Sequence, residues 1–585
     1  MSRSRSRSPV RGLPLGLALV VAASACGGEV GVDPADARPL DAGPDAAPPD
    51  PSAAVFDPEV IHDIELTMPA VAWTDIAGNP RAETWHVATF RWGDETVGQV
   101  GVRAFGYSSH VVGKPPLKLD FDHVDRGQEW RGLEQLKLRN AYNDASFMHD
   151  ALAPWMLRRA GVTASRTGWA RVSVNGTPVG FYTVMESIDD VFLKRNFRTD
   201  AGPLYSIDGI RGHGLMPLTE PLRYFQFNTS VTGDGSDLVD VTRIVASGSD
   251  ARLAEVLDLD GFFDESIVRT LSGSQDSFSA DGNNFYLYND PWLDPVPGDL
   301  HGTWRVIPWD YNFDFTSLGF QAALTVEPAR PWATSNYAQD PTTGAPYRDV
   351  VMLRQIASGR DPDARARELA DGVLAYPDLL ARVEAWRTLI RDEVARDPIG
   401  GAVRFDRGVA NDLQYLRMRW SNTLGREVAA CAPLEAGAVP VRDLSPAGTV
   451  GWGTLSVDGW SWGGPGRCLS GQRDCFGFDV AGRHDCRGLF AHAPSTVTIT
   501  VPAAHTRLRG AVGLQGIGTE CGDGVVFRVV QDGVTRWQSG TLRSYSPAQE
   551  LVDVVIHAGA VQLVADPLGE ISCDMATWLD LRVVP

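Results

Sequence analysis

The chain has 585 residues, which is too long for one ordinary hydrophobic core, so two or more domains are expected. Its composition, 43% hydrophobic and 22% charged, is typical of a globular protein. It carries 73 acidic against 53 basic residues, a net charge of −20. This balance argues against a nucleic-acid partner, because neutralising phosphates requires clustered lysine and arginine. No internal run approaches the roughly 20 apolar residues needed to cross a bilayer.

The N-terminus has the pattern of an export signal. Four arginines precede a short apolar segment, Leu13–Ala23, and small residues then lead to Cys26. The segment Ala23-Ser-Ala-Cys26 resembles a bacterial lipobox, although leucine is usual at the position of Ala23. Residues 1–26 are therefore predicted to be a signal peptide whose Cys26 is lipidated, which would hold the protein on the cell envelope. Cleavage after Ala-Ser-Ala without a lipid is the alternative.

Residues 27–52 consist largely of proline, aspartate and alanine, and are predicted to be a disordered stalk because they have little to bury. Of the seven cysteines, all except Cys26 lie in the last third of the chain. That clustering fits disulfide bonds in an exported protein, and sequence alone leaves the pairing open. A zinc site is disfavoured, because no C-x-x-C pair is present.

Short β-type segments such as His86–Trp92 and Val97–Arg103 follow the stalk. A helix is predicted near Ser146–Ala160, with Gly161 as its C-terminal cap. Alternating segments then flank Asn175-Gly176, which is the strongest short signal for a β-hairpin.

A long helix is predicted to begin at Pro377, because apolar residues recur at helical spacing up to Val394. Residues 53–430 are thus predicted to form an α+β domain, and residues 431–447 a linker. Residues 448–585 contain many short strands with Gly and Asp turns, typical of an all-β sandwich of jelly-roll type.

Phosphoryl transfer requires a cation for the phosphates, oxygen ligands for Mg²⁺ and a carboxylate beside the attacking hydroxyl. The usual nucleotide loops are absent, since Pro115 follows Gly113-Lys114 where a P-loop has Ser or Thr. The chain nevertheless resembles the CotH spore-coat kinase family in a series of ordered motifs: 102–109, 114–121, 136–140, 144–146, 174–176, 186–189, Asp276, 283–288 and 307–312.

This resemblance implies an atypical protein-kinase-type fold and an ATP-dependent activity. Asp276 takes the role of the catalytic carboxylate, and Asn284 and Asp310 those of ligands for Mg²⁺ or Mn²⁺. Taken singly, Asp310 and Asp276 could also be ordinary turn or loop carboxylates.

Three further side chains are assigned to ATP by the same resemblance. Arg103 and Lys114 are expected at the phosphates, and Glu186 is expected to orient a cation. The alternatives are a surface role for Lys114 and a structural ion pair of Glu186 with Arg139 or Arg171.

The C-terminal region resembles the NPCBM family of carbohydrate-binding modules through Gly488–Ser495, Val526–Val529 and Cys573–Trp578, among other segments. The resemblance implies a polysaccharide or glycan ligand. Sugars stack on exposed aromatic rings, so the candidates are Trp452, Trp460 and Trp462, whereas core packing is the alternative for tryptophan. Cys521 and Cys573 are the disulfide expected first.

The sequence is therefore interpreted as an exported, surface-held kinase that transfers phosphate from ATP to Ser or Thr of a secreted or surface protein, with a glycan-binding module for targeting. Membrane contact is expected through the N-terminal lipid only. A catalytically inactive surface adhesin or scaffold is the second interpretation. A carbohydrate-active protein related to glycoside hydrolases is the third.

Overall fold

The computed structural model describes residues 50–207, 213–229, 231–274, 276–293, 302–315, 348–460, 476–516 and 521–585. The candidate residues Cys26 and Trp462, together with Cys468 and Cys475, lie outside these ranges. Residues Pro51–Pro585 form one compact unit. In the part of the chain that is described, no helix is both long and apolar enough to cross a membrane.

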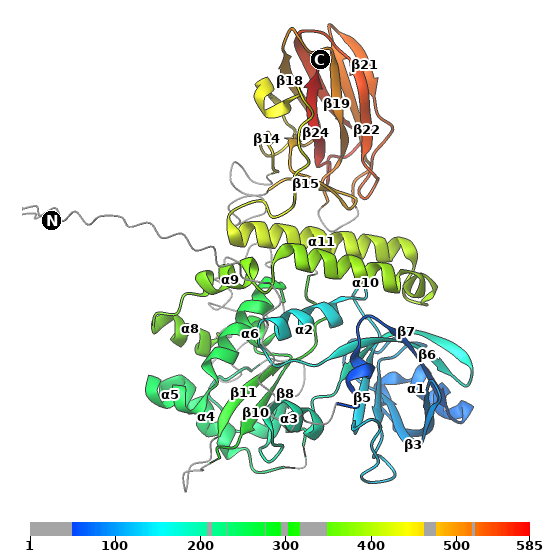
Figure 1. The fold of residues 1–585 in the computed structure, drawn as a ribbon, viewed down its shortest axis with the longest axis vertical. Helices are drawn as coiled ribbons and strands as arrows, with labels where there is room; N and C mark the ends of the chain where they lie inside the picture. The colour runs from blue at the N-terminus through cyan, green and yellow to red at the C-terminus, as the bar shows by residue number, and fades with distance from the viewer. Residues whose placement is uncertain are drawn as a thin grey trace, which may run out of the picture. The chain divides into compact units, whose positions relative to one another are not determined.

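The first structural element is a closed barrel with strand order β1-β2-β3-β4-β5-β7-β6 (Figure 1). Its strands pair antiparallel except β1 and β6, which close the barrel in parallel. The strands are β1 (Ile61–Thr67), β2 (His86–Trp92), β3 (Glu95–Ala104), β4 (Leu117–Asp120), β5 (Gln135–Arg139), β6 (Thr167–Val174) and β7 (Thr177–Glu186).

Apolar side chains at every second position of the strands fill the inside of the barrel. Val100 and Val102 of β3, Leu117 and Leu119 of β4, and Leu136 and Leu138 of β5 belong to one buried apolar cluster. Because successive residues of a strand point to opposite faces, the residues between them lie on the outer face. That outer face carries the charged residues discussed below.

The predicted hairpin and helix are confirmed. β6 and β7 are joined at Asn175 and Gly176, whose φ angles of 52° and 74° are those that a type I′ turn requires. Helix α2 (His149–Arg159) lies slightly inside the predicted range and is followed by Gly161 with a φ of 86°. α1 (Ala70–Gly78) and α3 (Asp190–Phe197) are further helices of this region.

The second element is a small sheet of order β11-β10-β8-β9, with helices around it (Figure 1). Its strands are β8 (Leu204–Ile207), β9 (Phe225–Phe227), β10 (Phe285–Asp290) and β11 (Thr303–Pro308). The helices are α4 (Ser236–Ser247), α5 (Asp250–Val256), α6 (Leu259–Leu271), α7 (Phe278–Asp281), α8 (Val350–Ala357), α9 (Pro362–Asp371), α10 (Tyr376–Arg396) and α11 (Ala402–Leu424).

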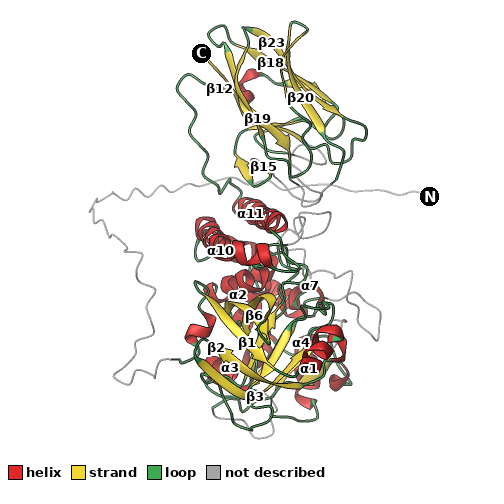
Figure 2. Cartoon of the chain, turned by 90° about the vertical axis from the view of Figure 1, so that its right-hand side faces the viewer, coloured by secondary structure: helices red, strands yellow, loops and turns green. Residues whose placement is uncertain are grey.

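The long helix predicted from Pro377 is α10, which packs along α11 (Figures 1 and 2). Its buried positions, from Leu379 through Trp386 to Val394, follow the predicted 3.6-residue period. α11 is followed by Gly425, whose φ of 67° makes it a left-handed C-cap, and the helical region thus ends near the predicted boundary.

The C-terminal region is an all-β sandwich. One sheet has the order β14-β17-β24-β19-β22, with β12 also paired to β24, and the other β13-β18-β23-β20-β21. β15 and β16 form a separate hairpin. The strands are β12 (Val439–Pro440), β13 (Ala447–Thr449), β14 (Ser456–Val457), β15 (Phe478–Val480), β16 (Arg483–Asp485), β17 (Gly488–Phe490), β18 (Ser495–Val501), β19 (Arg507–Leu514), β20 (Val525–Gln531), β21 (Val534–Gln538), β22 (Gln549–Val555), β23 (Gly559–Pro567) and β24 (Ala576–Val584).

The sandwich core is built by period-two burial, as in β18, where Val497, Ile499 and Val501 are buried. Disulfides join Cys431 to Cys486 and Cys521 to Cys573, the second being the pair expected first. The predicted fold class, an α+β domain followed by an all-β sandwich, is confirmed.

Candidate functional site

The outer face of the barrel carries a row of cations. Arg103 of β3 is in register with Lys118 of β4, which is in register with Lys137 of β5. Arg139 lies two residues beyond Lys137 and so shares its face. Cross-strand neighbours lie about 5 Å apart, so like charges in such a row repel one another.

Lys137 is the more deeply buried of the two lysines in this row, with 8% of its surface exposed. Its ammonium lies 3.3 Å from the Tyr286 hydroxyl and 4.0 Å from the centre of the Trp309 ring. Burial, and then the charge of Lys118, hold the pKa of Lys137 well below its ordinary value.

Lys118 is half-buried and behaves in a similar way. Burial, and next the neighbouring Arg103, lower its pKa. Among the described residues, no carboxylate lies within ion-pair distance of the ammonium of either Lys118 or Lys137. Charges withdrawn from water are normally paired, so two such lysines without counter-charges mark a place suited to an anion.

Arg139 connects the barrel to the loop after β11. Its guanidinium donates to Asp150 of α2 at 3.1 Å and forms an ion pair with Asp310. Burial alone would lower the pKa of Arg139, but these two carboxylates outweigh it and raise the pKa. Asp310 therefore lies at the edge of the cation row, with 28% of its side chain exposed.

The other two residues assigned to catalysis and metal binding lie next to that loop. Asn284 donates from its side chain to the Asp276 carbonyl at 2.8 Å, and its own carbonyl accepts the Trp309 N–H at 3.0 Å. Asn284 and Asp310 have φ angles of 54° and 51°, a left-handed conformation that Asn and Asp tolerate better than other residues. The structure thus brings Asp276, Asn284 and Asp310 together.

A further candidate for metal binding, Asp281, which sequence reasoning missed, lies beside Asp276. Burial raises the pKa of Asp281 to about 9, with further contributions from the charge of Asp276 and a hydrogen bond to it. The Asp281 Oδ1 is buried without a hydrogen-bond partner. Asp276 in turn accepts a hydrogen bond from Asn283 at 2.9 Å. Two adjoining carboxyl groups with an orphaned oxygen suit a divalent cation, so these residues fit the expected Mg²⁺.

The structure places Glu186 and Arg103 in ion pairs. Glu186 lies at the end of β7 between Arg166 and Arg195, with closest distances of 2.7 and 2.6 Å. The alternative partners named above, Arg139 and Arg171, are not the ones it contacts. Arg103 pairs with Glu83 and lies over the Trp85 ring.

Lys114 lies away from this group of contacts. Its ammonium is 2.8 Å from Asp397 and 3.2 Å from the Asn140 carbonyl, and both charged side chains are essentially inaccessible. Burial lowers the pKa of Lys114 to about 8, although the Asp397 charge opposes that shift. The expected phosphate contact does not fit this position, because a buried lysine already paired with a buried carboxylate has no free face for a ligand.

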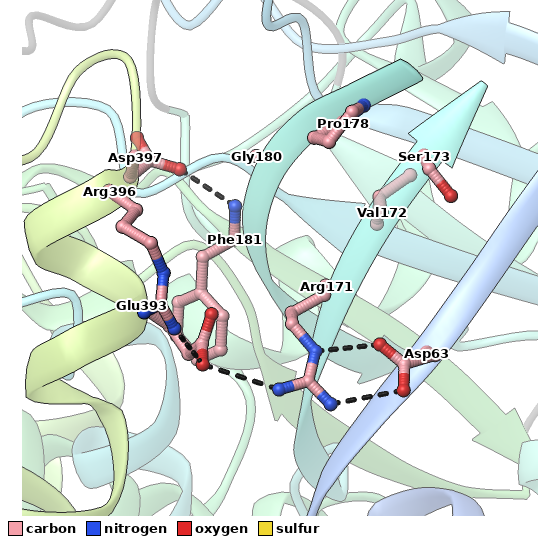
Figure 3. Close-up of a pocket in the computed structure, with 10 residues that line it drawn as sticks. All are labelled: Asp63, Arg171, Val172, Ser173, Pro178, Gly180, Phe181, Glu393, Arg396 and Asp397. Carbon is pink, nitrogen blue, oxygen red and sulfur yellow. Dashed lines mark hydrogen bonds and ion pairs between the residues drawn. The ribbon is translucent and has the colours of Figure 1, made fainter. Parts of the chain in front are cut away.

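Asp397 lines a separate pocket of about 350 Å³ between β6, β7 and the end of α10 (Figure 3). Arg171 spans this pocket, donating to Asp63 on one side and to Glu393 on the other. Asp397 accepts the Phe181 N–H at 2.7 Å. The charged side chains of the pocket are paired, Arg171 with Asp63 and Glu393, Arg396 with Glu393, and Asp397 with Lys114 behind it.

The aromatic candidates of the sandwich behave differently from one another. Trp452 is 44% exposed and contacts the His492 ring edge-on, with centroids 6.1 Å apart. Trp460 is 3% exposed and packs near Phe490, so it fills the core and is inaccessible for stacking on a sugar. His492 is buried, with Nδ1 2.7 Å from the Ala493 carbonyl oxygen.

Lys118, Lys137, Arg139 and Asp281 are the residues that sequence reasoning missed. A usable signal existed in Leu136-Lys-Leu-Arg139, where basic residues alternate with leucine. In a closed barrel both faces of such a strand can be covered, and a lysine on the covered outer face then needs a partner.

The barrel, the helical region and this cluster of cations, carboxylates and amides define a kinase-like protein. The family model for the CotH kinase protein matches residues 102–415, more than half of the chain, and the chain belongs to this family. The model for the NPCBM/NEW2 domain matches residues 447–584.

A curated relative is the inner spore coat protein H of Bacillus subtilis, 25% identical over 196 residues, which are 31% of this chain and 50% of the relative. The chain thus spans about half the length of that relative. Among solved structures, the proinflammatory kinase CtkA of Helicobacter pylori is similar over 52% of this chain and 90% of its own, with 9% identity and a TM-score of 0.26. CBM51 from Clostridium perfringens GH95, in complex with methyl-galactose, is similar over 25% of this chain and 99% of its own, with 18% identity and a TM-score of 0.21.

Proposed function

We propose that the N-terminal domain is a phosphotransferase that uses ATP and a divalent cation to phosphorylate Ser or Thr of a secreted or surface protein. The observation that carries this proposal is the pair of neighbouring lysines, Lys118 and Lys137, withdrawn from water without carboxylate partners. A polyphosphate supplies the missing negative charge, and Lys137 is held close to Asp310 through Trp309 and Arg139.

Asp310, Asn284 and Asp281 offer the oxygen atoms that would hold Mg²⁺ or Mn²⁺. Such a cation, when bound, neutralises charge on the transferred phosphoryl group. Asp276, with its carboxylate oriented by Asn283, is the group proposed to accept the proton of the attacking hydroxyl. Glu186 orients two arginines rather than a phosphate, so we assign it a positioning role.

Calorimetric titration with ATP and Mg²⁺ tests the nucleotide site. Lys137→Met should weaken ATP binding by about tenfold or more, because it removes a charge-assisted contact to phosphate. Lys194→Met is the matched control: Lys194 is 58% exposed on α3 and pairs with Asp200, so ATP binding should be unchanged. Equal affinity of wild type and Lys137→Met, or no ATP binding by wild type, contradicts the proposal.

One observation favours a second function, that of an inactive surface scaffold. The Asp310 carboxylate is already paired with Arg139, which competes with a metal ion for the same oxygens. A scaffold would bind neither ATP nor Mg²⁺, so the same titration separates the two functions.

For the C-terminal domain we propose glycan binding, with Trp452 as the stacking platform because it is exposed beside His492. Retention on a panel of polysaccharide columns tests this assignment. Trp452→Ala should abolish retention, whereas Val534→Ala, which trims a side chain of similar exposure on β21, should not. Equal retention of both variants would exclude Trp452 from the glycan site.

Export and attachment to the cell envelope through a lipid on Cys26 remain part of the proposal. The two disulfides of the described chain support an oxidising location. Mass spectrometry of the mature N-terminus distinguishes an acylated Cys26 from a chain cleaved without lipid.

A further inference from the structure

Three side chains of the kinds that bind zinc meet just beyond the end of α11, and a fourth, Cys431, is bonded to one of them. Ligand atoms of Glu427, His484 and Cys486 all lie within 4.8 Å of one another. Cys431 is joined to Cys486 by a disulfide, with the two Cα atoms 5.5 Å apart. The His484 Nε2 is 3.8 Å from the Cys486 sulfur and 3.5 Å from Glu427 Oε2.

The His484 ring is held in the orientation that a metal ligand requires. Its Nδ1 lies 3.2 Å from the Asp479 carboxylate, and Asp479 is itself fixed by an ion pair with Arg417 of α11. A carboxylate on one ring nitrogen directs the other nitrogen toward the metal in most histidine sites. Here that other nitrogen, Nε2, faces the sulfur and the Glu427 carboxylate.

We propose that Glu427, Cys431, His484 and Cys486 form a zinc site in the reduced protein, and that the Cys431–Cys486 disulfide closes this site in the oxidised protein. Two thiolates, an imidazole and a carboxylate are donors that zinc prefers, and together they complete four-fold coordination. The donors come from two segments distant in the sequence, which is why the lack of a C-x-x-C pair does not exclude the site.

The switch between the two states is a thiol–disulfide exchange with a dithiol reductant. A thiolate of the reductant attacks the sulfur of the exposed Cys431, and the S–S bond breaks with its electron pair going to Cys486 beside His484. The second thiol of the reductant then attacks the mixed disulfide and releases the Cys431 thiolate. The protein disulfide is reduced to two thiols, the dithiol is oxidised to its disulfide, and Zn²⁺ binding displaces one proton from each thiol.

Direct zinc titration of the full chain tests the proposal. The protein is reduced with dithiothreitol, freed of the reductant without air, and titrated with Zn²⁺ against a chromophoric chelator. Reduced wild type should bind one zinc ion more tightly than the oxidised protein by at least about a hundredfold, since the two thiolates exist only after reduction. His484→Ala should weaken that affinity by about tenfold or more while leaving every cysteine in place.

A control variant excludes zinc binding by the other thiols of the two domains. It carries Cys468→Ser, Cys475→Ser, Cys521→Ser and Cys573→Ser, so that Cys431 and Cys486 are the only cysteines left downstream of the stalk. This variant should still bind the zinc ion. If it unfolds, Co²⁺ replaces Zn²⁺ in the reduced wild type, where thiolate-to-metal absorption that disappears in Cys486→Ser reports the site. Equal zinc affinity of oxidised and reduced wild type, or of wild type and His484→Ala, overturns the proposal.

Discussion

At the scale of single residues, the protonation of Lys137 controls the charge of the candidate nucleotide site. Its pKa lies well below the ordinary value because the side chain is buried beside Lys118, and its nearest partners, Tyr286 and Trp309, carry no formal charge. A bound phosphate favours the protonated lysine and raises that pKa again. If the proposed function holds, nucleotide binding is therefore coupled to proton uptake.

This coupling gives a measurable prediction. ATP binding should be accompanied by uptake of protons at pH values between the pKa of Lys137 in the free protein and its higher pKa in the complex, and affinity should fall as the pH rises through this range. Calorimetry in buffers of different ionisation enthalpy measures the uptake directly. Lys137→Met should lose it and Lys194→Met should keep it. Binding heats that do not depend on the buffer in wild type would contradict the prediction.

Replacing Asp310 and replacing Asp276 should impair different steps of the proposed reaction. Asp310→Ala removes an oxygen ligand, so the increase in ATP affinity produced by Mg²⁺ should disappear together with turnover. Asp276→Ala should leave ATP binding largely intact while phosphate transfer falls by about a hundredfold or more. Binding and transfer are measured on the same preparations, with the exposed Asp378→Ala as the unaffected control. Parallel loss of binding in both variants would mean that Asp276 is not a separate catalytic group.

Lys114 should affect stability rather than nucleotide binding, because its ammonium is buried against Asp397. Lys114→Met leaves that carboxylate without its counter-charge, which costs about 3–5 kcal/mol in the free energy of unfolding. Adding Asp397→Asn removes the stranded charge and should recover part of the loss. Denaturant unfolding measures the free energy of unfolding of the single and the double variant, and the ATP affinity of both should equal that of wild type.

The pH dependence of the same pair has a defined sign. The pKa of Lys114 falls from 10.5 to about 8 on folding, so between these values the unfolded chain binds more protons than the folded one. The contribution of Lys114 to the free energy of unfolding therefore rises as the pH increases from about 8 to 10.5. The difference in stability between wild type and Lys114→Met should grow from about pH 8 to about pH 10. A difference that stays constant would show that the lysine keeps its ordinary pKa on folding, and a difference that shrinks would show that its pKa is raised.

At the scale of elements, the β6–β7 hairpin depends on its turn. Gly176 has a φ of 74° and open space where a Cβ atom would lie, so the only cost of Gly176→Ala is backbone strain, about 1–2 kcal/mol. Gly78 at the end of α1 has equally open surroundings without a positive φ, so Gly78→Ala should be neutral or slightly stabilising. The melting temperature should therefore fall in Gly176→Ala, whereas in Gly78→Ala it should stay the same or rise slightly.

At the scale of the whole molecule, a buried ion pair links α11 to the β15–β16 hairpin. Arg417 is 1% exposed and contacts Asp479, and a second bond of 3.2 Å reaches Glu427. Arg417→Met removes the buried guanidinium that neutralises Asp479 and Glu427, leaving these two carboxylates with their contacts to His484, and should lower the free energy of unfolding by about 3–5 kcal/mol. Arg391→Met is the control, since Arg391 is 44% exposed and water screens its pair with Asp406, so the loss should be much smaller than that of Arg417→Met. If the two variants lose the same free energy of unfolding, the buried pair of Arg417 and Asp479 stabilises the protein no more than an exposed ion pair does.

Local patterns in the sequence determined most of the elements. The Asn175-Gly176 turn, the helix beginning near Pro377 and the alternating strand at 495–501 follow from backbone preferences and from side-chain period, which act over a few residues. The ordered motifs were sufficient for the family, and the resemblance predicted one site for Asp276, Asn284 and Asp310, of which Asn284 and Asp276 share a hydrogen bond.

Tertiary structure alone decided the charges of that site. Whether a lysine is paired depends on contacts between segments far apart in the chain: Lys114 meets the Asp397 carboxylate, whereas Lys137 meets uncharged aromatic side chains such as Tyr286 and Trp309. Burial likewise separates Trp452 from Trp460, which look alike in the sequence. Local preference therefore fixes the elements, and long-range packing sets which side chains are buried, paired and available for chemistry.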